Sequence, residues 1–127
     1  MTIVVVMVVV IVMIVVLKNN FLQQNSKTIT YEIENRTYRL LVADTPKKWE
    51  KGLMYIKKKE NFDGMIFYFP EKSFRSFWNK NTLVDLDIYW LVDKKVIGKG
   101  TLPSVAKNGL ITISSSEPVN RVIEIIR

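Results

Sequence analysis

Two aspartates spaced two residues apart, Asp85 and Asp87, are the strongest candidates in this sequence for acid–base chemistry. They lie in the run FWNKNTLVDLDIYW, residues 77–90. In an extended strand, side chains two apart share a face, so the carboxylates would lie about 7 Å apart. That spacing fits an acid and a base or nucleophile, as in a glycosidase-like hydrolase. The same carboxylates could instead hold a hard cation such as Ca²⁺.

A structural role competes with catalysis for these two aspartates. Acids two apart on one strand face are common and are usually solvated, whereas catalytic pairs normally face each other across a cleft. We therefore expect Asp85 to be solvated and Asp87 to accept hydrogen bonds from the backbone or from a lysine.

The absence of two residue types excludes much other chemistry. The chain contains no His and no Cys. Ser-His and Cys-His catalysis, disulfides and thiolate or imidazole metal sites are therefore excluded. We assign no catalytic residue, no cofactor and no metal, and the sequence favours a non-catalytic binding module over the hydrolase.

The polar residues before the aspartates predict a corner of the chain. Asn and Thr side chains satisfy backbone groups at turns, so Asn81 and Thr82 are expected to turn the chain. Trp78 beside Lys80 pairs an aromatic ring with a cation, which suits anionic or sugar-like ligands. The corner is either purely structural or shapes a shallow pocket. The expected lining of that pocket is Trp78, Lys80, Asn81, Thr82, Asp87, Gly52 and Met54.

Short apolar segments predict the elements that must position this corner. A hairpin is expected from 28–34 and 37–43, and further strands at 65–69, 73–78, 83–90, 94–102, 109–114 and 119–127. A short helix should follow Asp44, because Thr45 can cap it, Pro46 suits its first turn and Gly52 can end it. The pattern predicts a mainly β fold, a small antiparallel barrel or sandwich with one short helix.

Residues 1–17 form an apolar segment without a single charge. As a helix it would be roughly 25 Å long, slightly less than a hydrocarbon core of about 30 Å. It lacks the basic start and the small-residue cleavage site of a signal peptide, and it lacks the polar face of a core helix. We expect a transmembrane anchor at 1–17, a juxtamembrane linker at 18–27 and a single β domain at 28–127.

All the charges fall after the apolar segment, giving a net charge of +7. A basic stretch could bind anionic lipid headgroups or nucleic acid, or could simply be a solvated surface. Because the domain would be tethered near a bilayer, lipid is the expected partner and no specific nucleic acid is expected. The stretch comprises Lys47, Lys48, Lys51, Lys57, Lys58 and Lys59.

Several motifs together resemble the family called domain of unknown function 192. They are KGLMY, DGMIFYF, the Trp-x-Lys-Asn-Thr run and VIEI near the end, in the family's order. Asn79 stands where the family usually has Met, and Asp85 where it often has Pro. The resemblance implies a compact, mainly β domain, often exported or membrane-attached, with no established activity.

The expected location is the outer side of the cytoplasmic membrane. The resemblance implies this, although the basic residues after the apolar segment would favour the opposite orientation. The triplet Asn35-Arg36-Thr37 would be a glycosylation acceptor only in an extracellular domain.

Overall fold

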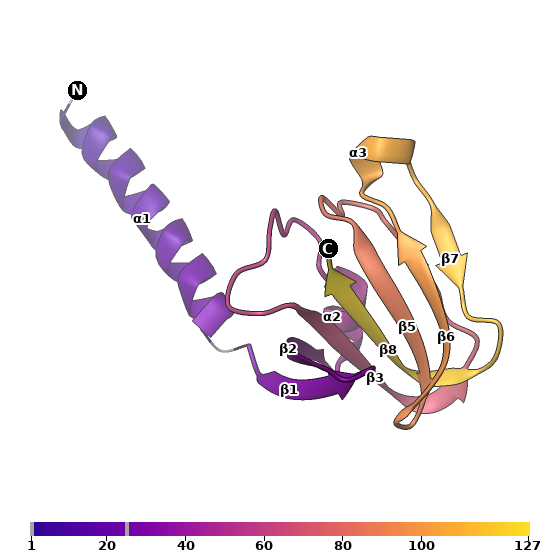
Figure 1. Cartoon of the computed structure of the whole chain (residues 1–127). Helices are drawn as coiled ribbons and strands as arrows, with labels where there is room; N and C mark the ends of the chain where they lie inside the picture. Colours follow the sequence, from indigo (N-terminus) through magenta and orange to yellow (C-terminus); the bar gives the residue numbers. More distant parts are fainter. Residues whose placement is uncertain (1, 25) are drawn as a thin grey trace.

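The domain is built on a six-stranded sheet with the strand order β1-β2-β3-β8-β5-β6 (Figure 1). This computed structural model describes residues 2–24 and 26–127. Its strands are β1 (Thr28–Ile33), β2 (Arg36–Ala43), β3 (Gly64–Ser73), β8 (Val119–Ile126), β5 (Leu86–Val92) and β6 (Lys95–Leu102). A second sheet pairs β4 (Ser76–Trp78) with β7 (Thr112–Ser114). The helices are α1 (Thr2–Gln24), α2 (Pro46–Lys51) and the single turn α3 (Val105–Asn108).

The first hairpin forms as the sequence predicts, with its turn one residue earlier than expected. Glu34 and Asn35 connect β1 to β2, and both have positive φ angles, 51° and 65°. Two such residues define the hairpin turn whose twist matches the flanking strands. Asn35 is exposed at the tip of this turn.

The expectation of a wholly antiparallel sheet is wrong at one pair of strands. β2 and β3 run parallel, with Leu40 opposite Gly64 and Ala43 opposite Phe67, while the other neighbours in the sheet are antiparallel. The crossover that carries α2 returns the chain to the start of β3, and such a connection produces a parallel pair. The sheet is also open, because β1 and β6 remain its two edges.

Helix α2 begins and ends at the residues that the sequence indicates. The Thr45 hydroxyl accepts a hydrogen bond from the backbone N–H of Lys48, and Pro46 opens the first turn. Gly52 caps the end, where its N–H donates to the Lys48 carbonyl. Trp49 and Leu53, on one side of the helix, pack into the core.

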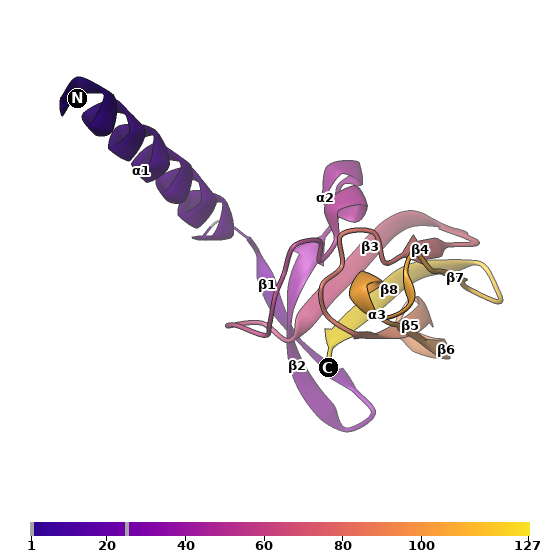
Figure 2. The same cartoon turned by 90° about the horizontal axis from the view of Figure 1, so that it is seen from above.

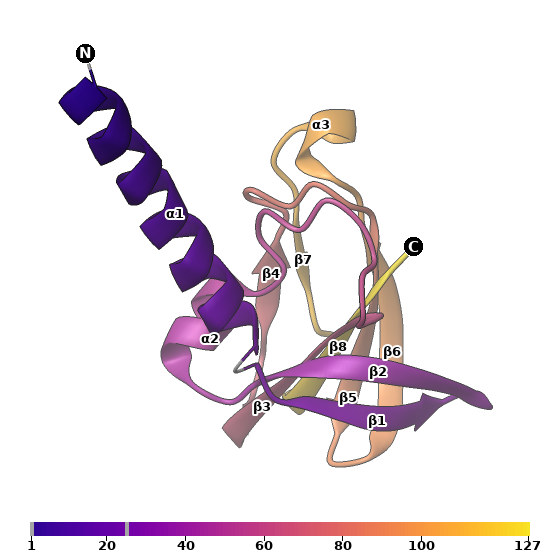
Figure 3. The same cartoon turned by 90° about the vertical axis from the view of Figure 1, so that its left-hand side faces the viewer.

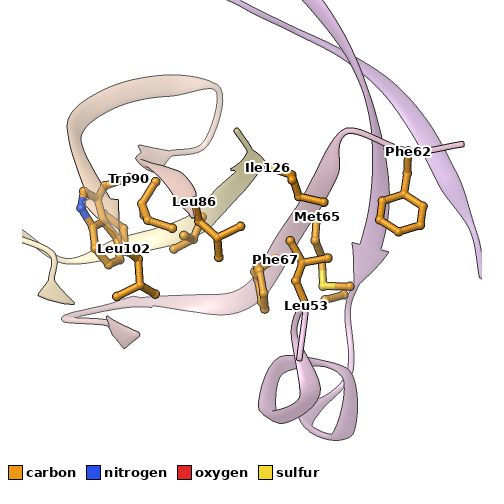
Figure 4. Packing of buried hydrophobic residues seen from close by; sticks show 12 residues of the cluster. Leu53, Phe62, Met65, Phe67, Leu86, Trp90, Leu102 and Ile126 are labelled. Atoms are coloured by element: carbon orange, nitrogen blue, oxygen red, sulfur yellow. The ribbon is translucent and has the colours of Figure 1, made fainter. Parts of the chain in front are cut away.

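Buried side chains lie on both faces of the large sheet. Along β8, Val122 and Ile126 enter the cluster beneath α2, β4 and β7, while Ile123 and Ile125 enter the cluster on the other face. Figure 4 shows the first cluster at close range, and Figure 2 shows α2 and the β4–β7 pair on the same side of the sheet. Alternation from Val122 to Ile126 therefore directs the side chains of β8 to the two faces of the sheet in turn.

Helix α1 projects away from the sheet (Figures 1 and 3). Each side chain from Ile3 to Leu17 leaves 48–75% of its surface exposed. The helix continues to Gln24, so most of the linker expected at 18–27 is helical, and residue 25 lies outside the described part of the chain. Over the described residues, none of the helices has the length and hydropathy needed to cross a membrane.

Candidate functional site

A cavity of about 410 Å³ opens between α2, the end of β3 and strand β4, on the face of the sheet that these elements cover. Aromatic residues and polar or charged residues contribute to its walls in equal number. The lining consists of Trp49, Glu50, Lys51, Gly52, Leu53, Met54, Phe67, Phe69, Phe74, Arg75, Ser76, Phe77, Trp78, Thr82 and Glu124. A concave site that combines aromatic side chains with converging polar groups is a common form of small-molecule site.

Glu124 brings a carboxyl group into this cavity from the central strand β8. It lies opposite Met65 on β3 and Ile88 on β5, and only 4% of it is exposed. Its Oε2 atom is buried and has no hydrogen-bond partner in the described part of the chain. Burial raises the pKa of Glu124 to about 8, because the charged form loses its hydration. At neutral pH this group is therefore mainly a carboxylic acid that can both donate and accept.

Glu124 was not among the residues predicted from the sequence, although a signal was present. In the predicted strand 119–127, Val122, Glu124 and Ile126 alternate with apolar residues of the other face. Since both faces of β8 are apolar, its one acid must point into a core. A carboxylate in such a register costs folding free energy unless it is paired or hydrogen-bonded.

Gly52 lets the end of α2 approach the buried carboxyl group. Its φ angle is 48°, in the region that L residues rarely adopt. A Cβ atom at this position would lie 3.4 Å from Phe67 Cζ and 3.9 Å from Glu124 Oε2. These are ordinary contact distances, so it is the backbone conformation that favours glycine here.

Arg75 presents a guanidinium group to the cavity from the segment between β3 and β4. Its Cζ lies 3.9 Å from the centroid of the Phe69 ring, and its Nη2 donates to the Glu71 carbonyl at 2.9 Å. The Arg75 backbone is fixed by Ser115, whose hydroxyl accepts from the Arg75 N–H and whose own N–H donates to the Arg75 carbonyl. The buried Nε has no acceptor among the described residues.

Aromatic rings hold each other in place around these polar groups. Trp49 packs at 4.9 Å from Phe69, and Phe77 meets Phe67 edge to face at 5.0 Å, measured between ring centroids. The indole N–H of Trp49 donates to the Ala43 carbonyl at 3.0 Å, which ties α2 to the end of β2. Trp78 is 48% exposed and supplies an accessible ring in the lining.

The structure divides the residues predicted to form a pocket into two groups. Gly52, Met54, Trp78 and Thr82 line the cavity, whereas Lys80, Asn81 and Asp87 are absent from its lining. The exposed Lys80 ammonium group lies 5.1 Å from the centroid of the Trp78 ring. Binding of a ligand by any of these seven residues stays a prediction.

Asn81 and Asp87 have other places in the fold. Asn81 adopts a positive φ of 53°, and its carbonyl accepts a hydrogen bond from the Tyr55 N–H at 2.9 Å. Asp87 lies on β5 beside the buried Leu86, so its side chain points to the opposite face of the sheet from the cavity.

The corner itself depends on Asn79, which is fully buried. Its Nδ2 donates to the carbonyls of Pro103 and Gly109 at 3.0 and 2.8 Å, and its Oδ1 accepts from the Ile111 N–H at 2.7 Å. As the sequence predicts, Asn81 and Thr82 lie in a turn, in which the Thr82 N–H donates to the Asn79 carbonyl at 3.0 Å, but the buried role of Asn79 was not predicted. The sequence shows polar residues close together but not which of them points inward.

The two aspartates are ion-paired and do not line the cavity. Asp85 precedes β5 and accepts hydrogen bonds from Lys107 and from the Ser104 N–H. The expectation that its carboxylate is solvated is therefore wrong, because two partners hold it in place. The hydrogen bond from Lys107, followed by that from Ser104, lowers the pKa of Asp85. Asp87 accepts from Arg127 Nε at 2.8 Å. The geometry therefore gives the hydrolase alternative no support.

The basic side chains of the stretch 47–59 are solvent-exposed. This applies to Lys47, Lys48, Lys51, Lys57, Lys58 and Lys59. Lys48 pairs with Asp44 at 3.3 Å, one helical turn earlier. The remaining cations form an exposed positive surface around α2 and the loop that follows it.

The fold is that of a small, mainly β domain with a cavity beneath a short helix. The chain belongs to the uncharacterised DUF192 family, described as "Uncharacterized ACR", which matches residues 28–127. No curated protein matches the chain.

Two solved structures are similar to this chain. One, from Sinorhizobium meliloti 1021 and described as a candidate transcription regulator, is 30% identical, with a TM-score of 0.60 over 78% of both chains. The other, a protein of unknown function from Novosphingobium aromaticivorans DSM 12444, is 21% identical, with a TM-score of 0.59 over 80% of this chain and 82% of the other. The second likeness is one of fold alone.

Proposed function

We propose that this protein is a non-catalytic binding module that captures a small molecule in the cavity beneath α2. The observation that carries the proposal is the unpartnered Oε2 atom of Glu124, a residue that is 4% exposed and lines the cavity of about 410 Å³. An unpaired buried polar group destabilises a fold, and a ligand that pairs with it recovers that free energy on binding.

The binding module is held at a membrane by α1. In support, residues 1–17 carry no charge, and the apolar side chains from Ile3 to Leu17 are exposed. The uncharged run is a few residues shorter than a full span. Local thinning of the bilayer and snorkelling of Lys18 accommodate a segment of this length. The domain faces the outer side of the membrane.

The exposed lysines of the stretch 47–59 then meet the anionic headgroups of the same bilayer. Each basic side chain near such a surface contributes about 1 kcal/mol, and salt screens the attraction. The description of the Sinorhizobium relative raises nucleic acid as the other polyanion for this surface. Comparing the affinity of the full chain for anionic vesicles with its affinity for duplex DNA, at the same salt concentration, distinguishes a lipid partner from a nucleic-acid partner.

Capture of a neutral aromatic probe tests the cavity. Full-length protein in zwitterionic nanodiscs is titrated with 2-naphthylacetamide while the backbone amides are followed by NMR. We expect saturable shifts at Gly52, Met54 and Thr82, which line the cavity. Trp78→Ala should weaken binding by about threefold to tenfold, the contribution expected of one aromatic contact.

Leu110→Ala is the matched control, because Leu110 is an exposed apolar residue outside the cavity lining. Its affinity for the probe should equal that of the wild type. Shifts that do not saturate, or that are weakened as much by Leu110→Ala as by Trp78→Ala, would mean that the probe only partitions onto apolar surface.

A further inference from the structure

Arg75 is a cavity-lining cation that forms no ion pair in the described part of the chain. In the described part of the chain, ion pairs form between Lys48 and Asp44, Lys99 and Glu34, Lys107 and Asp85, and Arg127 and Asp87. Arg75 takes part in none of them, although it lines the cavity. An arginine keeps its charge at any physiological pH, so this charge has no carboxylate partner within the described part of the domain.

The guanidinium group is also preorganised. The Phe69 ring supports one face of it at 3.9 Å, the Glu71 carbonyl fixes Nη2, and Ser115 binds the Arg75 backbone through two hydrogen bonds. The buried Nε donor has no acceptor among the described residues. A planar, stacked guanidinium held this way matches the geometry of a carboxylate or phosphate group.

The other charged groups of the cavity favour an anion as well. The lining contains the cations Lys51 and Arg75 and the exposed carboxylate of Glu50. The buried carboxyl of Glu124 is largely protonated at pH 7 because its pKa is raised to about 8, so it adds little negative charge. The cavity is therefore net positive around neutral pH.

The strand geometry separates the two polar ends of the site. Glu124 lies opposite Met65, and Arg75 stacks on Phe69, four residues further along β3. Four residues of strand correspond to about 13 Å. Phe67 lies between them, with its ring 6.4 Å from that of Phe69. A molecule in the cavity thus meets a hydrogen-bonding acid at one end, rings in the middle and a cation at the other end.

We propose that the cavity selects small molecules that carry a carboxylate or another compact anionic group on a flat ring, with the anion bound by Arg75 and the ring against Phe67. This inference rests on the proposed function, since it assigns the ligand class of the same cavity.

Two isosteric probes test the inference. 2-Naphthylacetate and 2-naphthylacetamide differ only in the charged group, and each is titrated into full-length protein in zwitterionic nanodiscs at pH 7. We expect the acetate to bind roughly tenfold or more tightly than the amide, the gain expected of a charge-assisted bidentate contact. In Arg75→Met this ratio should fall to near one, while the amide retains its affinity.

Arg121→Met is the matched control. Arg121 also stacks on an aromatic ring, with its Cζ 5.1 Å from the centroid of Tyr68, but it is absent from the cavity lining. The ratio should be unchanged in this variant. A second measurement, the NMR signal of the Arg75 Nε–H in the wild type, covers the case in which Arg75→Met does not fold: the acetate should shift it and the amide should not.

The outcomes separate the two proposals. If the amide binds the cavity but the acetate binds no more tightly, or if Arg75→Met leaves the ratio intact, the assignment of an anionic ligand to Arg75 is overturned while the binding module stands. If neither probe gives saturable shifts at the cavity residues, the proposed function itself fails. A ratio that falls equally in Arg121→Met would show a general effect of surface charge and would also overturn the inference.

Discussion

Burial of the Glu124 carboxyl group makes the stability of the domain depend on pH. Its folded pKa of about 8 lies above the ordinary value of 4.5, so the folded state binds the proton more tightly than the unfolded state does. The resulting stability is fully present below about pH 4.5 and is lost as pH rises toward 8. In the wild type the free energy of unfolding should fall by on the order of 3–5 kcal/mol over this pH range, and Glu124→Gln should abolish that fall. Thermal melts between pH 5 and 9 measure it.

Glu117→Gln is the control for this prediction, because Glu117 is exposed in the loop before β8. Its melting temperature should follow that of the wild type across the whole pH range. If the wild type and Glu124→Gln show the same slope between pH 5 and 9, Glu124 is ionised in the folded protein and burial does not keep its carboxyl group protonated.

The two asparagines of the corner should respond differently to mutation. Asn79→Ala removes three hydrogen bonds inside the fold and should lower the free energy of unfolding by about 2–4 kcal/mol. Asn81→Gly should be nearly neutral, since glycine accepts a φ of 53° at no steric cost, and Asn81→Ala should cost about 1 kcal/mol. Denaturant titration measures all three, with the exposed Asn61→Ala as control. Equal losses in Asn79→Ala and Asn61→Ala would contradict the assignment.

At the scale of elements, α3 is a single turn attached to the start of β5 through Asp85. The carboxylate binds the Ser104 N–H at the N-cap of α3 and Lys107 in its last turn. Asp85→Asn should therefore lower the melting temperature at pH 7 and speed hydrogen exchange at Ser104. Because the folded pKa of Asp85 is depressed, its contribution is present above about pH 3.8 and disappears as pH falls further.

Asp87→Asn is the comparison within the same strand, since Asp87 is paired with Arg127 at the end of the chain. It should leave exchange at Ser104 unchanged. A difference between wild type and Asp85→Asn that does not shrink as pH falls below 3.8 would show that Asp85 does not act through its charged form.

At the scale of the whole molecule, the apolar helix should determine whether the protein stays with the membrane. The wild type should stay with membranes through a carbonate wash. Val9→Arg, at the middle of the uncharged run, should release part of the protein, because a central arginine costs about 3 kcal/mol in a bilayer. Val9→Leu should not release it.

The side of the membrane on which the β domain lies can be tested with a single cysteine. The chain contains no other Cys, so Leu110→Cys introduces one labelling site on the domain. Labelling by an impermeant maleimide in intact cells is expected; labelling only after lysis would place the domain inside.

The sequence by itself determined the local elements, because their signals lie within a few residues. The turn at Glu34 and Asn35, the capping of α2 by Thr45 and Gly52, and the alternation of Leu86, Ile88 and Trp90 all follow from such short-range rules. Family membership followed from spaced motifs. Gly52, Met54, Trp78 and Thr82 could be named as pocket residues for the same reason, since they lie within these motifs.

Only the tertiary structure decided which polar groups meet. The parallel pairing of β2 with β3 depends on the path of the crossover, which no local pattern encodes. Glu124 and Arg75 come from segments about fifty residues apart in sequence, and they share a cavity because β8 and β3 are neighbours in the sheet. Asp85 and Asp87 looked like a catalytic pair, but long-range partners, Lys107 and Arg127, bind them separately. Contacts between distant segments depend on how the sheet assembles, and that assembly reflects the packing of the whole core.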